Sequence, residues 1–193
     1  MSALHDILGQ LVQPGTVDAV SQKTGIAPGS AATVIASALP LLVAGLARNA
    51  QSPDGASSLA SALTRDHDGS VLDNLAGFLG SGQAASAGAG ILGHVFGSRT
   101  ETMSSALGRT AGVDAGQAQQ VLAMLAPLVL GALGRTTRQE GLAPDALAGR
   151  LQAERDELQS ASPVGGLVMQ WLDQDGDGSV LDDLGDMAKR FMR

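Results

Sequence analysis

The chain has 193 residues, enough for one large domain or two small ones. Hydrophobic residues make up 44% and charged residues 16%, a balance that excludes a disordered chain. Cysteine is absent, which excludes disulfides and thiolate metal sites, and the net charge of −7 argues against a nucleic-acid partner because phosphate binding needs Lys and Arg.

The residue types predict an all-α protein. Ala, Leu and Gly outnumber the β-branched and aromatic residues typical of strands, and no Asn-Gly hairpin signal occurs. Aromatic residues make up only 2%, so the core is expected to consist of Leu, Val and Ala. These small side chains let helices approach closely.

The first twelve residues predict an amphipathic helix. They include His5 and Asp6 and have no basic start, long apolar run or cleavage site, the features that define a secretory signal. We therefore expect a cytoplasmic protein.

Two long, mostly apolar segments, 24–50 and 111–137, align without gaps. Each has a proline near its middle and an arginine near its end, Arg48 or Arg135. A basic residue suits the negative end of a helix dipole, so we predict a long helix in each segment.

The uncharged parts of these segments, 24–47 and 115–134, are long enough to approach a membrane span. They are rich in Ala, Gly, Ser, Thr or Gln, which insert poorly, and each contains a proline, Pro40 or Pro127. We favour two buried, kinked core helices over two membrane spans.

An acidic block follows each long helix. Residues 66–75 read DHDGSVLDNL and residues 175–184 read DGDGSVLDDL; together with the two residues before each, we call them the first acidic block (64–75) and the second acidic block (173–184). Because the order of long helix and acidic loop occurs twice, we predict a pseudo-symmetric helical domain over residues 1–193, built from internal repeats at about 24–79 and 111–193.

Further helices are expected around these blocks. Asp114 and Gln117 predict a capping box at the start of the second long helix. Residues 139–160 predict an exposed helix, and a final amphipathic helix is expected from Ser179. The glutamates expected to be solvated are Glu140, Glu154 and Glu157.

The second acidic block resembles a calcium-binding loop. Its aspartates at alternate positions, followed by glycine, fit the first, third, fifth and sixth positions of an EF-hand loop. Leu184 replaces the usual twelfth-position Glu, so an Asp at the tenth position would close a shortened loop. The predicted calcium ligands are Asp173, Asp175, Asp177, Ser179 through its backbone carbonyl, and Asp182.

The first acidic block is a weaker candidate for calcium. Thr64 replaces the first aspartate, and Arg65 and His67 reduce the negative charge. Both blocks also have the form of a helix cap, which explains acidic residues without an ion, although capping does not require three alternating aspartates. We expect the first block to bind weakly or not at all. Its candidate ligands are Asp66, Asp68, Ser70 and Asp73.

No catalytic constellation is visible. His5, His67 and His94 do not have zinc-binding spacing, and no G-x-S-x-G or phosphate-binding loop occurs. We expect no enzyme; a catalytic site between the two halves is the least supported alternative.

Four pieces of sequence occur in order between residue 24 and the C-terminus: LPLLVAGLARNAQSPDGASSLASAL, DHDGSVLDNLAGFLG, GAGILGHVFG and WLDQDGDGSVLDDL. In wording and order they resemble the bacterial family called domain of unknown function 937, to which YidB-like proteins are related. The resemblance implies a bacterial, helical, cytoplasmic protein. It carries no assigned activity, so no catalytic residue can be transferred.

We therefore expect a non-catalytic helical protein that binds calcium in the second acidic block. It would act through contacts with a protein partner or with further copies of itself. The alternative is a membrane- or surface-associated helical protein that self-assembles without metal.

Overall fold

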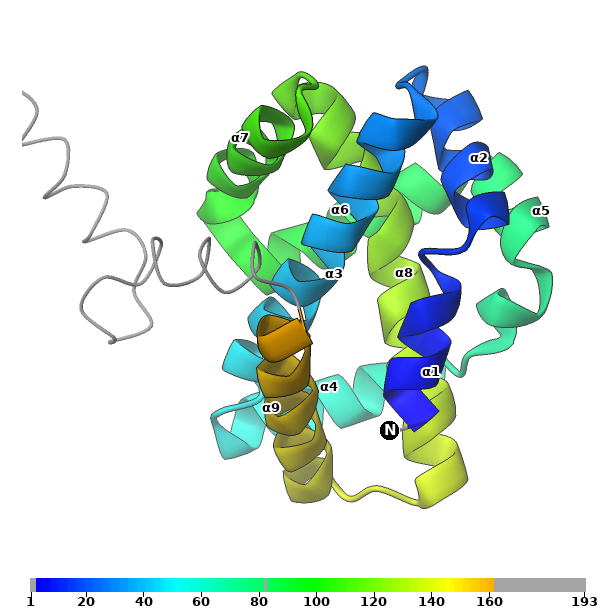
Figure 1. The fold of residues 1–193 in the computed structure, drawn as a ribbon. Helices are drawn as coiled ribbons and strands as arrows, with labels where there is room; N and C mark the ends of the chain where they lie inside the picture. Colours follow the sequence, from blue (N-terminus) through cyan, green and yellow to red (C-terminus); the bar gives the residue numbers. More distant parts are fainter. Residues whose placement is uncertain (1–2, 82, 162–193) are drawn as a thin grey trace, which may run out of the picture. The chain divides into compact units, whose positions relative to one another are not determined.

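The computed structural model describes residues 3–81 and 83–161. This part of the chain is helical and contains no strand, which confirms the all-α prediction (Figure 1). The helices in chain order are α1 (Ala3–Gln10), α2 (Pro14–Thr24), α3 (Pro28–Asn49), α4 (Pro53–Asp66), the 3-10 helix η1 (Ser70–Asn74), α5 (Leu75–Gly80), α6 (Gln83–Phe96), the 3-10 helix η2 (Gly97–Arg99), α7 (Thr100–Ala111), α8 (Ala115–Glu140) and α9 (Pro144–Ala161).

The chain separates into two compact units, residues 1–155 and 156–193. Most of the described residues belong to the first unit, and the boundary between the units falls within α9. The expectation of a single domain over residues 1–193 stays a prediction.

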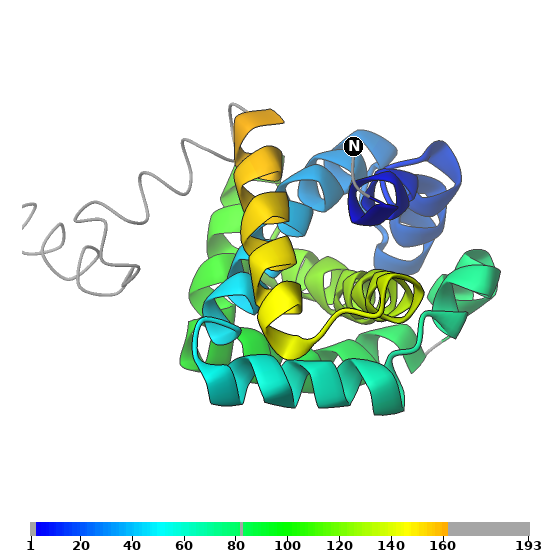
Figure 2. The same cartoon turned by 90° about the horizontal axis from the view of Figure 1, so that it is seen from below.

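Helix α8 is the centre of the first unit. It contacts α1, α2, α3, α4, α6, α7 and η1, and Figure 2 looks nearly along it with other helices on several sides. Every residue from Val121 to Gly134 is buried. A helix that is apolar on all faces is stable in water only when other elements cover it, so α8 supplies the core against which the others pack.

Helices α3 and α8 are both long and apolar enough to cross a membrane by length and composition. Within each helix, the protein buries a large part of an apolar stretch of 18 residues: 61% of it in α3 and 78% of it in α8. Core helices pass the same composition test, and this burial agrees with the predicted core role of both segments.

The two long helices have similar local settings. Each contains its predicted proline, Pro40 or Pro127, at a buried position. Each is also preceded by a helix that ends at a left-handed glycine, Gly25 at φ 71° and Gly112 at φ 68°. The pseudo-symmetric arrangement of the two copies stays a prediction, because the acidic block of the second copy lies outside the described residues.

Sequence signals locate several helix ends. The capping box predicted at Asp114 and Gln117 is present: the Gln117 backbone N–H donates to Asp114 Oδ1 at 2.8 Å, and the Asp114 N–H donates to Gln117 Oε1 at 3.4 Å. Prolines begin α2, α3 and α4, where a missing N–H leaves no helical hydrogen bond unmade.

Helices α6 and α8 touch backbone to backbone at Gly88. A Cβ atom on Gly88 would lie 1.6 Å from the carbonyl oxygen of Ala123. No side chain fits there, so this glycine sets how closely the two helices approach.

We predict that Gly88→Ala lowers the free energy of unfolding by about 1–3 kcal/mol, because the new methyl group forces α6 away from α8. Chemical denaturation measures the change. Gly90→Ala is the matched control on the same helix, since a Cβ at Gly90 meets nothing within 4 Å. It should be neutral or stabilising by up to about 1 kcal/mol. Equal effects of the two variants would contradict this packing.

Candidate functional site

The stronger of the two predicted calcium loops is not described by the structure. The predicted ligands that lie outside the described residues are Asp173, Asp175, Asp177, Ser179 and Asp182. The first acidic block is described: Asp66 ends α4, Asp68 lies in the following loop, and Ser70 and Asp73 belong to η1.

The first acidic block lies directly on the backbone of α8. A Cβ on Gly134 would lie 1.7 Å from the carbonyl oxygen of His67, and a Cβ on Gly131 would lie 2.6 Å from Val71 Cγ1. Gly69 has φ 90°, a conformation that side chains other than glycine rarely adopt. We call Gly131 and Gly134 the glycine seat, because only residues without a side chain let the loop approach this closely.

Arg135 of α8 holds the seated loop. Its Nη2 donates to the carbonyl oxygen of Gly69 at 2.6 Å and to Asp73 Oδ1 at 2.5 Å. The Arg135 side chain is 24% exposed and the Asp73 side chain is 71% exposed, so the hydrogen bond to the Gly69 carbonyl oxygen is better shielded from water than the ion pair with Asp73. One arginine thus joins the turn and η1 to the end of α8.

The other two carboxylates of the block also have cationic partners. The Arg65 guanidinium donates two hydrogen bonds to Asp66 Oδ2, from Nε and from Nη2. These hydrogen bonds lower the pKa of the Asp66 carboxyl. Asp68 accepts from the Ser70 backbone N–H at 3.0 Å, which lowers the pKa of Asp68, and lies 3.6 Å from Arg138. Three arginines therefore stand opposite three aspartates.

The three aspartates face different partners. Within residues 3–81 and 83–158, Asp66, Asp68 and Asp73 do not form a cluster that could hold a metal ion. The expectation that this block binds calcium weakly or not at all stays a prediction, and the arginine contacts give it a physical reason.

We predict that Arg135→Gln loosens the first acidic block and lowers the free energy of unfolding by about 1–2 kcal/mol, because it removes charged hydrogen bonds at a partly exposed site. Hydrogen exchange should show faster exchange of the amides around Gly69. Arg48→Gln is the matched control, because Arg48 aligns with Arg135 but is exposed and has no ion pair in the described part of the chain. Unchanged exchange in Arg135→Gln would contradict the role given to this arginine.

His67 makes the stability of the first unit depend on pH. Burial lowers the pKa of the imidazole below its ordinary value of 6.5, and the charge of Asp66 offsets part of this shift. The folded state therefore prefers neutral His67 more than the unfolded state does. Its contribution to stability is complete above pH 6.5 and is lost as the pH falls through the lower pKa of the folded state.

We predict that the free energy of unfolding falls as the pH drops below about 6.5, and that His67→Gln flattens this part of the curve. Urea denaturation across this window measures it. His94→Gln should retain the slope. A slope that is the same in His67→Gln and the parent chain would show that another group is responsible.

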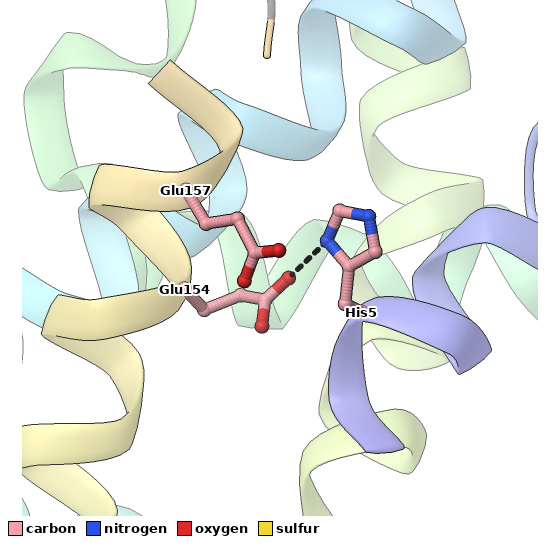
Figure 3. A group of neighbouring side chains, drawn as sticks. All are labelled: His5, Glu154 and Glu157. Carbon is pink, nitrogen blue, oxygen red and sulfur yellow. Dashed lines mark hydrogen bonds and ion pairs between the residues drawn. The ribbon is translucent and has the colours of Figure 1, made fainter. Parts of the chain in front are cut away.

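The structure brings together a pair that the sequence analysis missed. His5 Nδ1 lies 3.2 Å from Glu154 Oε1, although the residues are 149 positions apart (Figure 3). Glu154 is only 1% exposed, so the expectation that it is solvated was wrong. The signal was in its spacing: Leu147, Leu151 and Glu154 follow the helical period and form one buried stripe of α9.

Comparison with known proteins gives the family. Residues 6–136 match the family described as bacterial protein of unknown function (DUF937). The chain belongs to this family. The DUF937 match includes the first acidic block, the glycine seat and the central helix α8 as far as residue 136, and it ends before α9 and the second acidic block. No curated protein and no solved structure matches the chain.

Membership confirms the resemblance to this family, and the match covers the first three of the four quoted pieces of sequence but not the fourth, WLDQDGDGSVLDDL. DUF937 has no stated activity, so the family match assigns no role to any residue of this chain.

Proposed function

We propose that this DUF937 protein is a non-catalytic helical protein that binds Ca²⁺ in its second acidic block and acts through contacts with a protein partner or a second copy of itself. The observation that carries the proposal is the contrast between the two acidic blocks. The first is neutralised by arginines, whereas the second has more carboxylates and fewer cations within it.

The contrast is visible position by position. Where the first block has Arg65, the second has Gln174, and where the first has His67, the second has Gly176. The second block also has Asp173 at the position where the first block has the uncharged Thr64. Carboxylates placed this close together repel one another unless a cation or protons neutralise them, so the second block has the stronger need for a bound ion.

The end of α3 lacks the glycine seat that the first block uses on α8. Ala47 aligns with Gly134 of the seat and is already 1% exposed. Arg48, which aligns with the clamping Arg135, is exposed. The end of α3 therefore has the aligned arginine but has no glycine at the position aligned with Gly134.

Calcium is the ion that suits this block. Ca²⁺ takes six to eight oxygen ligands, and alternating aspartates followed by glycine supply carboxylates and a backbone carbonyl around one turn. Asp182 would close the loop in place of a longer Glu. Because Asp binds less readily through both oxygens, we expect modest affinity.

Isothermal titration of the chelator-treated full chain with CaCl₂ tests the proposal. We predict measurable heat and a rise in melting temperature in calcium, both lost in Asp175→Ala and Asp177→Ala. Asp66→Ala and Asp68→Ala are the matched controls in the first block and should bind calcium as the parent does. No heat and no thermal shift in the parent chain would remove calcium from the proposal.

The part of the proposal that concerns protein contacts has a separate test. Light scattering with and without calcium measures whether the chain associates with itself, and a change in mass would support the second copy as partner. A constant monomer mass in both conditions would count against it.

A membrane- or surface-associated protein that self-assembles is the second candidate. The length and apolar composition of α3 and α8 favour it, and the burial of both helices opposes it. Liposome flotation separates the two candidates, since complete recovery in the soluble fraction would count against membrane association.

A further inference from the structure

The contact between α1 and α9 places two metal-binding groups together. The His5 imidazole comes from α1 and the Glu154 carboxylate from α9, and Figure 3 shows the two side chains pointing toward each other. Both residues belong to the first unit. Groups mounted on helices are held more firmly than groups on loops, so this pair is well placed to bind a third group.

The spacing of the two atoms fits a shared metal ion. Adjacent ligands of a tetrahedral zinc ion, each about 2.0–2.1 Å from the metal, are about 3.3 Å apart. His5 Nδ1 and Glu154 Oε1 are 3.2 Å apart. A small rotation of either side chain would therefore convert the hydrogen bond into two bonds to one ion.

Burial and charge favour a cation at this place. Glu154 is 1% exposed, and a carboxylate is retained at such a position only when it is paired. The His5 side chain is 27% exposed, so an ion can reach the pair from solvent.

The chemistry of the pair selects the kind of metal. Imidazole nitrogen suits Zn²⁺ and similar transition metals, whereas Ca²⁺ takes oxygen ligands.

We propose that His5 and Glu154 bind a divalent transition-metal ion of the Zn²⁺ type, with water completing its coordination. The ion joins the N-terminal helix α1 to α9. This inference is independent of the proposed calcium loop, because it uses different residues, a different ligand chemistry and a different metal.

Zinc titration of the full chain tests this site, and excess calcium is included so that it competes with zinc for the oxygen ligands of the acidic blocks. The chain has three histidines, so their imidazole signals can be followed separately by NMR. We predict that Zn²⁺ shifts the His5 signal and leaves the signals of His67 and His94 in place.

His5→Gln and Glu154→Gln should each weaken zinc binding by more than about tenfold, because loss of even an indirect partner of a metal costs about 10- to 100-fold. His67→Gln, His94→Gln and Asp6→Asn are the controls and should bind zinc as the parent does. Because Glu154 is buried, circular dichroism must show that its variant is folded; His5→Gln at a more exposed position gives the result independently.

Two results would overturn the proposal. One is an unshifted His5 signal in saturating Zn²⁺. The other is zinc binding by His5→Gln that equals that of the parent, which would place the ion elsewhere on the chain.

Discussion

The first unit depends on the burial of α8 by all its neighbours. Val121 to Gly134 have no exposed face, so each turn of this helix stabilises the protein only if another helix covers it. The core has almost no aromatic residues to fill wide gaps, and the helices compensate by approaching closely. Gly88 brings α6 against the backbone of α8, and the glycine seat does the same for the first acidic block.

Close approach also explains the electrostatics of the first acidic block. Once the loop lies on the glycine seat, Arg135 is near enough to bond to the Gly69 carbonyl and the Asp73 carboxylate. Packing therefore determines which cation neutralises the loop. In the first block the cation is a guanidinium of the protein itself, and in our proposal for the second block it is calcium.

The sequence was sufficient for features that depend on neighbouring residues. The helical class, the two long helices with their prolines and the capping box at Asp114 follow from composition, period and local hydrogen bonding. The partners of the acidic blocks could not be predicted in this way. Arg135 and Gly69 are 66 residues apart, and a contact of that kind depends on tertiary packing that no local pattern reports.

Glu154 is a residue for which two sequence signals gave opposite predictions of burial. Charge predicted an exposed residue, while the spacing from Leu147 and Leu151 placed it on a buried stripe. The period was the better guide, because one polar residue on an apolar stripe follows the stripe when a partner such as His5 is available.

The position of α8 along the chain has a consequence for biosynthesis. The ribosome completes α1 to α7 before the first residue of α8, Ala115, is made. The apolar faces of α3 and α6 therefore cannot pack against α8, the helix that each contacts most, until the chain has grown past Gly134. A nascent chain that stalls within this interval exposes the surfaces most prone to aggregation, so speed of elongation and chaperone access matter most there.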